Sequence, residues 1–400
     1  VLASDLSALR TKLTGICPAA QPHALAELLR RHPAPVWLVI HEEAQKTETL
    51  AEDIALFHSA GGNKAMLEIL PFPEAQGGEM REAFNAASDR LAVLSKLRGL
   101  KGTAANSGTL LILTTPAALL QAVPPPADFA TREAELRRGG SHSFQGLLEL
   151  LRSFDYDSEA VCEAPGQYAV RGGIVDVYPV TAHQPCRLDF FGDLLEEIRA
   201  LDPVTQRSGE TIERVILTAA PLPGGRPGQT PAGQPLDQLG ALSLSKRQAG
   251  TAQLHASGLQ ASLLDYLNPA THAALIEPKA LEELFDTLAG PDSPDFAGRL
   301  AATATCLFGV GDLDLASRLF DPAGHEETWD TESLSHHRSY PAERLLAHER
   351  LAAEEDARWQ FLQKVAAWKQ TGYTVDFVVS KAGEEQRIRE LLGEHSALKK

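Results

Sequence analysis

Arg187, Asp189 and Phe191 place two charged side chains and an aromatic ring at a spacing of two residues. In an extended strand, residues two apart share a face, so these three side chains point one way, while Leu188 and Phe190 point the other. An Arg beside an exposed aromatic ring is a composition favoured at protein-binding hot spots. A simpler interpretation, which periodicity alone favours, is that Phe191 covers a hairpin turn and Arg187 pairs with Asp189.

The surrounding segment, 167–208, has the pattern of a compact antiparallel sheet. The dipeptide Gly172–Gly173 allows a tight bend, because glycine tolerates positive φ. Residues 174–178 form a β-branched and aromatic run that a proline ends. Gly192–Asp193 separates the next two strand-like runs, and glycine first in a two-residue loop is typical of a type II′ hairpin turn.

The chain lacks the motif of a nucleotide-hydrolysing site. A P-loop needs two glycines, a lysine and a hydroxyl at fixed spacing to hold the phosphates and Mg²⁺. The comparable stretch, 15–23, has no second glycine, no lysine and no Ser or Thr, and its two prolines remove backbone donors. The Gly-Lys neighbourhood at 61–64 lacks the spacing, and Glu277 stands alone where an ATPase carries an Asp-Glu pair. We therefore predict that this chain does not hydrolyse nucleotide.

Other candidate sites for chemistry have simpler explanations. Neither a G-x-S-x-G elbow nor an H-E-x-x-H zinc motif occurs in the sequence. The groups His325-Glu326-Glu327 and His336-His337 lack a third ligand at helical spacing, so we interpret the histidines as surface residues. Glu42 and Glu43 follow a strand-like run, where an α/β enzyme can carry a catalytic acid, but a helix N-terminus that favours acids explains them more simply.

Composition indicates a globular protein of several domains. Its 400 residues suggest two or three domains, and a net charge of −16 argues against a protein whose main task is to grip the phosphate backbone. The four cysteines lie far apart, so we expect reduced thiols in a cytoplasmic protein rather than a zinc site or disulfides. No apolar run approaches the ~20 residues of a membrane span. Both ends look like cuts through a longer protein.

The order of the expected elements indicates an α/β fold that a smaller domain interrupts. Apolar runs at 36–40, 65–70 and 110–114 alternate with helical patterns, which is typical of a parallel, doubly wound sheet. The expected divisions are 1–125 and 216–400 for the α/β domain and 126–215 for the small α+β domain. The other expected elements are helices at 5–13, 42–58, 143–154 with Ser143 as N-cap, 341–369 and 382–392, and strands at 273–276 and 373–379.

Three segments resemble, in order and at close spacing, the UvrB-homology module of bacterial transcription-repair coupling factors (Mfd): AVRGGIVDVYP, CRLDFFGDLLEEIRALDP and VTQRS. The excision-repair protein UvrB carries a looser form of this module. The degenerate stretch at 15–23 agrees with the coupling factors and departs from UvrB, whose P-loop is intact. UvrB also carries a tyrosine-rich DNA-binding hairpin, whereas the segment 70–94 has no aromatic cluster.

The resemblance implies a fold, a partner and a site. The fold is a helicase-like parallel-sheet domain with a degenerate nucleotide site, interrupted by a small α+β domain with an antiparallel sheet. In both families the small domain, here 126–215, binds UvrA. The family's UvrA contacts carry over to Arg171 in A-V-R-G-G, and to Arg187 and Phe191 in R-L-D-F-F. These residue types suit such a role, because an Arg can pair with an acidic partner and a Phe can fill an apolar pocket.

The resemblance also implies that this chain is a protein-docking module without a cofactor of its own, and not an enzyme. The parent protein would be an ATP-dependent DNA translocase that displaces stalled RNA polymerase. Its ATP, Mg²⁺, polymerase and DNA would be bound by domains outside this chain. In the family, a C-terminal domain masks the UvrA-binding face until activation. One alternative is a UvrB-type ATP-dependent subunit that loads onto damaged DNA, and another is a diverged scaffold that has lost its partner.

Overall fold

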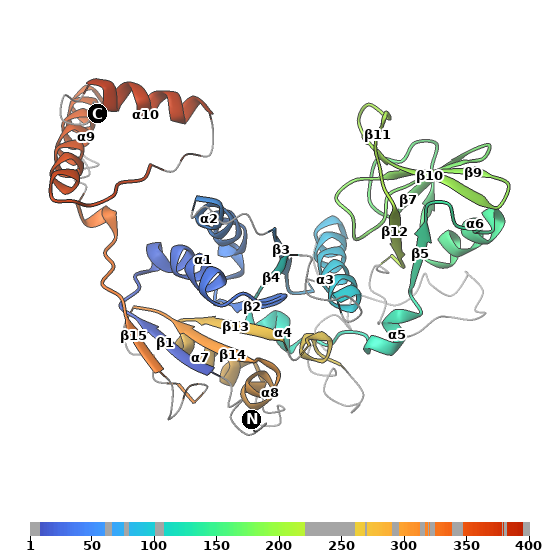
Figure 1. Ribbon diagram of the computed structural model, residues 1–400, viewed down its shortest axis with the longest axis horizontal. Coiled ribbons are helices and arrows are strands. Elements are labelled where there is room, and N and C mark those ends of the chain that lie inside the picture. Colours follow the sequence, from blue (N-terminus) through green and yellow to red (C-terminus); the bar gives the residue numbers. More distant parts are fainter. Residues whose placement is uncertain are drawn as a thin grey trace. The chain divides into compact units, whose positions relative to one another are not determined.

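The computed structural model divides the chain into two compact units (Figure 1). The first contains the described residues of 1–15 and 21–329, and the second contains those of 16–20 and 330–400. None of the described helices is long and apolar enough to cross a membrane. The residues that the structure describes are 9–60, 66–75, 80–100, 108–220, 261–268, 270–289, 296–312, 317–318, 320, 325–337, 347–377, 379 and 382–394.

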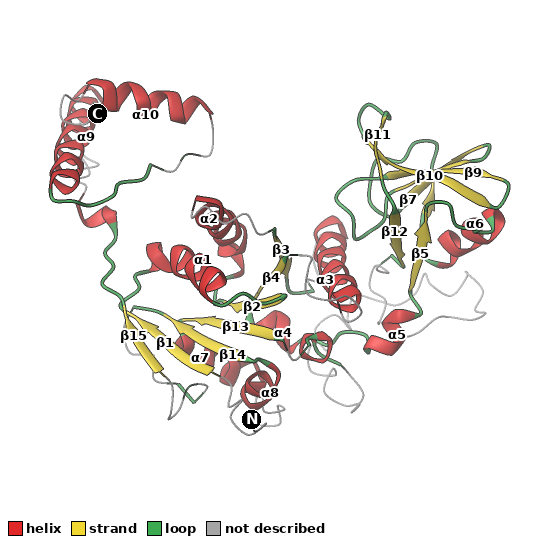
Figure 2. Cartoon of the chain, viewed as in Figure 1, coloured by secondary structure: helices red, strands yellow, loops and turns green. Residues whose placement is uncertain are grey.

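A seven-stranded parallel sheet forms the centre of the first unit (Figure 2). Its order is β15 (His325–Thr328), β1 (Leu9–Thr14), β14 (Cys306–Val310), β13 (Thr271–Ile276), β2 (Val36–Ile40), β4 (Thr109–Thr114) and β3 (Leu67–Phe72). Strands from the late part of the chain lie among those from the early part, because β13 and β14 lie between β1 and β2. All five residues of β2 are buried, as expected of a parallel strand covered on both faces.

Helices cover both faces of this sheet (Figure 1). On one face lie α1 (Gln21–Arg31) and α2 (Thr47–Ala60), and on the other lie α4 (Pro116–Leu120), α7 (Pro278–Ala289) and α8 (Phe296–Thr303). Leu119 of α4, Leu281 of α7 and Leu300 of α8 share one buried cluster with Leu38 and Ile112 of the sheet. The expected α/β class, with a separate antiparallel-sheet domain, is confirmed.

In the segment 5–13, which we expected to be helical, residues 9–13 belong to strand β1 instead, and residues 5–8 lie outside the described residues. Leu9–Thr14 pairs in parallel with β14 and with β15. Leu13 is fully buried and Thr11 nearly so, while Lys12 between them is partly exposed, which is the period of two of a strand. The prediction was wrong because the strand's hydrogen-bonding partners begin only at Cys306, so no local pattern reports them.

The small domain is built on a second, six-stranded sheet. Its order is β11 (Ser208–Thr211), β10 (Leu194–Leu201), β9 (Cys186–Phe191), β8 (Ile174–Val177), β7 (Gln167–Arg171) and β6 (Asp157–Ser158). All neighbouring pairs are antiparallel except β6 with β7. A two-stranded sheet of β5 (Glu133–Arg137) and β12 (Arg214–Thr218) lies in the same domain. We placed the end of the small domain at residue 215, and β12 runs past that residue. The domain divisions stay predictions.

Local signals in the small domain were read correctly. Gly172 and Gly192 both have φ of +64°, and each begins the two-residue turn of a hairpin. Asp193 has no positive φ, so the second turn has the glycine-first chemistry of type II′. The helix α6 (Phe144–Ser153) begins after Ser143, whose Oγ accepts a hydrogen bond from Gly146 N at 3.1 Å. The expected N-cap is therefore present.

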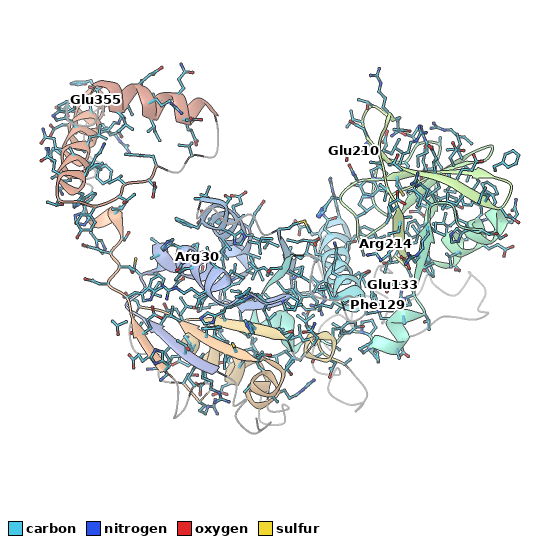
Figure 3. All side chains as sticks on the ribbon, in the orientation of Figure 1. Arg30, Phe129, Glu133, Glu210, Arg214 and Glu355 are labelled. Atoms are coloured by element: carbon cyan, nitrogen blue, oxygen red, sulfur yellow. The ribbon has the colours of Figure 1, made fainter. Side chains whose placement is uncertain are left out.

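The helix α3 (Met80–Leu100) packs against both the large sheet and the small domain. Val93 and Leu97 belong to the core of the large sheet, whereas Phe84 packs on the core of the small domain. Arg98 of α3 also pairs with Glu133 at the start of β5, Nη1 to Oε2 at 3.1 Å. Glu133 is labelled in Figure 3. The helix therefore fixes the small domain to the α/β domain from one side.

The second unit contains α9 (Ala347–Gln370) and α10 (Ala382–Glu394). Both helices were expected, although 341–346 lies outside the described residues. The strand expected at 373–379 is wrong for the part that can be described, because 373–377 and 379 have no strand pairing. A single apolar run is not stable as a strand without neighbouring strands, which the described part of this unit lacks. The Pro- and Gly-rich connection at 221–235 lies outside the described residues.

Candidate protein-binding site

The outer face of the six-stranded sheet carries the residues that the sequence singled out. Leu188 and Phe190 are buried in the small-domain core, whereas Arg187, Asp189 and Phe191 lie on the opposite face. The predicted alternation along β9 is therefore confirmed. The sequence could give this result because the period of two is a local property of any strand.

Arg187 is bound to a carboxylate of its own sheet. Its Nε donates to Asp176 Oδ1 at 2.6 Å, and its Nη2 donates to Asp176 Oδ2 at 2.8 Å. A third hydrogen bond runs from Nη1 to Ser208 Oγ at 3.1 Å. Asp176 is 1% exposed, and its hydrogen bonds raise the pKa of Arg187 above the usual value. Arg187 thus compensates a buried negative charge.

The interpretation that Arg187 pairs with Asp189 is wrong. The register of β8 and β9 places Asp176 directly opposite Arg187. Residues directly opposite on antiparallel strands have Cβ atoms ~5 Å apart, and residues two apart along one strand lie ~7 Å apart. Asp176 is therefore the nearer carboxylate. A carboxylate within the apolar run Ile174–Val177 is the sequence signal that could have indicated a buried, paired charge.

Phe191 does not cover the hairpin turn, since 76% of its surface is exposed. It pairs across the strands with Leu194, which is 42% exposed. The two side chains form an apolar pair at the end of the hairpin of β9 and β10. Leu194 was not singled out in the sequence, because Leu194 and Leu195 are both apolar and only the register shows which one faces outward.

Arg171 lies on the same face, two strands away from Phe191. It pairs with Ile174, which in turn pairs with Asp189, so Arg171 is level with the middle of β9. Its side chain is exposed, and Nη2 donates to Ala160 O at 3.0 Å. Two strand spacings correspond to about 10 Å. The structure thus brings the three expected site residues onto one face, without contact between Arg171 and Arg187 among the described interactions.

Four hydrogen bonds, one of them to a side chain, hold the end of this hairpin. Asp193 Oδ1 accepts from Phe144 N at 3.0 Å, and Asp193 O accepts from His142 N at 2.7 Å. Leu195 exchanges two further hydrogen bonds with the loop at 139–140, at 2.7 and 3.0 Å. The hairpin therefore presents Phe191 from a rigid support rather than from a loose loop.

Glu277, which we compared from the sequence with the acidic pair of an ATPase, lies in a different arrangement. Glu277 follows β13 and has φ of +51°, an uncommon backbone conformation for a residue other than glycine. Its Oε1 accepts a hydrogen bond from Gln21 Nε2 at 3.0 Å and one from Asp312 N at 3.3 Å. Burial raises the pKa of its carboxyl group. The carboxylate that would face Mg²⁺ in an ATPase is thus used inside the chain.

Within the ranges that the structure describes, no group of three or more His, Cys, Asp or Glu side chains could hold a metal ion. The histidines at 325 and 336 are exposed, in line with their interpretation as surface residues. All four cysteines are free thiols. The other Gly-Lys neighbourhood, 61–64, lies outside the described residues.

Comparison with known proteins shows which proteins the domain with this face resembles. Residues 134–222, which include the whole six-stranded sheet, match the family model for the UvrB interaction domain. A transcription-repair-coupling factor of Myxococcus xanthus is 29% identical over 212 residues, which are 53% of this chain and 17% of the relative. This chain is related to the transcription-repair-coupling factors. The factor of Bacillus subtilis is 24% identical over 210 residues, again 17% of its length.

The resemblance to the UvrB-homology module of the coupling factors is therefore confirmed. The match spans 17% of the length of these coupling factors. The matched domain is the one that carries Arg171, Arg187 and Phe191.

Proposed function

We propose that this chain is the UvrA-docking module of a transcription-repair coupling factor and acts in nucleotide excision repair. The observation that carries the proposal is the exposed Phe191 on a rigid hairpin within the UvrB interaction domain. An aromatic ring that is 76% exposed contributes little to folding. Its burial against a partner would stabilise a complex by roughly 1.5–3 kcal/mol. The proposed contacts are Phe191, Arg171 and the outward side of Arg187.

We further propose that the chain does not bind or hydrolyse ATP. Glu277 is used by hydrogen bonds to Gln21 and Asp312, and the stretch 15–23 lacks a lysine and a hydroxyl. The UvrB-type ATPase alternative requires ATP binding by this chain. Calorimetric titration with ATP and Mg²⁺ distinguishes the two: saturable binding would support the alternative, and no heat of binding would support the docking module.

The remaining roles belong to the parent protein. The curated relatives are about six times longer than the matched part, so a motor that uses ATP and Mg²⁺ and binds DNA and RNA polymerase would lie in other domains. A C-terminal domain of the parent would mask the outer face of the sheet. The chain alone would then bind UvrA without activation.

The test is a titration of the 400-residue chain with purified UvrA from the same organism. We expect saturable binding by the unmodified chain, and loss of binding in the double variant Arg171→Ala/Phe191→Ala. Arg187 is left intact, because its removal would unpair buried Asp176 and confuse a folding defect with a lost contact.

Two outcomes would change the proposal. If the double variant binds as tightly as the unmodified chain, UvrA binds at another surface. If neither chain binds, the fold stands but UvrA docking by this chain does not. Unchanged melting temperature of the variant ensures that either result reports on the surface.

A further inference from the structure

The apolar pair at the hairpin end extends the proposed contact beyond Phe191. Leu194 faces the same side as Phe191 and lies directly opposite it in the strand register. Both are exposed, at 42% and 76%, although the same two strands bury Leu188, Leu195 and Ile198 completely. Two neighbouring exposed apolar side chains on one rigid hairpin form a surface that a partner can cover as a unit.

The rigidity of the hairpin end affects how much the apolar pair can contribute to the binding free energy. The four hydrogen bonds from the loop at 139–144 fix the hairpin end, and Asp193 supplies two of the acceptors. A side chain presented in its bound position loses little conformational freedom on association. Asp193 therefore acts as a positioning residue for the apolar pair.

The hairpin segment that carries the apolar pair has charged side chains of one sign. Residues 189–197 contain four carboxylates, at Asp189, Asp193, Glu196 and Glu197, and no lysine or arginine. Three nearby arginines are paired with carboxylates: Arg187 with Asp176, Arg199 with Glu197, and Arg138 with Glu213. Arg171 lies on the same face but two strands away, and it donates to Ala160 O. Glu196 is exposed and faces solvent beside the pair. The rim of this surface is acidic.

We propose that Leu194 is a second anchor beside Phe191, and that the partner surface is an apolar pocket with basic side chains at its rim. This inference rests on the proposed docking function and names the chemistry of the surface on UvrA that would receive the hairpin. Leu194 and Phe191 enter the pocket together, and Asp189, Glu196 and Asp193 face its basic rim. Complementary charge at a rim acts mainly on the rate of association and on its dependence on salt.

The test measures UvrA affinity for single variants of the full chain. Leu194→Ala is expected to weaken binding about tenfold, and Phe191→Ala at least as much. Val204→Ala is the matched apolar control, because Val204 is 89% exposed in the loop beyond the far end of β10. It is expected to change the affinity by less than about twofold.

Charge is tested by reversal at two exposed glutamates. Glu196→Lys is expected to weaken binding about fivefold or more at low salt, with a smaller effect at high salt. Glu149→Lys on α6 changes the net charge equally but lies on the helix that covers the opposite face of the sheet, so it is expected to leave the affinity within about twofold.

The outcomes separate this inference from the function on which it rests. If Phe191→Ala weakens binding while Leu194→Ala and Glu196→Lys behave like their controls, docking stands and the second anchor with its basic rim is overturned. If Phe191→Ala and Leu194→Ala both weaken binding but Glu196→Lys behaves like its control, the basic rim alone is overturned. If the unmodified chain does not bind UvrA, both the docking function and this inference fail.

Discussion

The carboxylate of Asp176 holds the guanidinium of Arg187 through two parallel hydrogen bonds, Nε to Oδ1 at 2.6 Å and Nη2 to Oδ2 at 2.8 Å. Asp176 is almost completely buried, and Arg187 is partly exposed. Removal of one partner of a buried ion pair leaves the other charge without compensation. An arginine proposed for binding is therefore also required by the fold, and the two roles need separate measurements.

Arg187→Ala is expected to lower the free energy of unfolding by about 3–5 kcal/mol, because buried Asp176 would lose its counter-ion. The double variant Asp176→Leu/Arg187→Met is expected to recover most of that loss, since well-packed apolar residues can replace a buried pair. Urea unfolding measures both. Arg171→Ala is the matched control, because exposed Arg171 makes a single described hydrogen bond to a backbone carbonyl. A change below about 1 kcal/mol in Arg187→Ala would contradict a stabilising role for the pair.

Arg90 of α3 is expected to be a second stability determinant. It is 6% exposed, donates to Pro73 O at 2.8 Å and Ala118 O at 3.4 Å, and lies over the ring of Phe72 at 4.2 Å. Burial lowers its pKa to about 10, so the side chain stays charged at neutral pH. Arg90→Met would remove the hydrogen bonds to Pro73 O and Ala118 O, of which Ala118 O keeps a donor in Gln121 N, and is expected to cost about 1–3 kcal/mol in urea unfolding.

Exposed Arg81, on the same helix, provides the control for Arg90. Arg81→Met is expected to stay within about 0.5 kcal/mol of the unmodified chain. Equal effects of the two substitutions would show that Arg90 contributes no more than an ordinary surface side chain.

His41 is expected to make the fold less stable in acid. It is buried, its Nε2 lies 3.1 Å from Thr47 Oγ1, and burial lowers its pKa to about 4. The unfolded chain binds a proton near pH 6.5, whereas the folded chain binds it only near pH 4. The stabilisation is thus fully present above pH 6.5 and is lost as the pH falls through about 4.

The pH effect is measured as the difference in unfolding free energy between pH 7 and pH 4.5. His41 should account for about 2 kcal/mol of that difference, and burial lowers the pKa of His32 and His272 in the same direction. His41→Gln should reduce the difference. An equally steep pH dependence in His41→Gln would show that other groups are responsible.

The sequence predicted those structural features that depend on residues close together along the chain. The alternation along β9, the glycine turns and the Ser143 cap all follow from local geometry. The partner of Arg187 did not, because it depends on the register between β8 and β9. The strand β1 was missed for the same reason, since it pairs with β14 and β15 near the other end of the chain.

The exposed position of Phe191 could be predicted from the sequence, because the strand period of two and the resemblance to the coupling factors both indicate it. Its neighbour Leu194 became visible only through the cross-strand pairing and through the burial of Leu195. The turn position of Asp193 does not by itself reveal its hydrogen bonds. Its main-chain oxygen accepts from His142 N, and its carboxylate accepts from Phe144 N.

Site-specific photocrosslinking at Phe191 tests the central claim most directly. A photoreactive phenylalanine analogue at position 191 is expected to form a covalent adduct with UvrA, whereas the same analogue at Val204 is not. The analogue preserves the aromatic ring, so the chain keeps its fold and its proposed anchor. An adduct from position 191 alone would place UvrA on the hairpin of β9 and β10. Equal adducts from both positions, or none from position 191 in a chain that binds UvrA, would contradict docking through this hairpin.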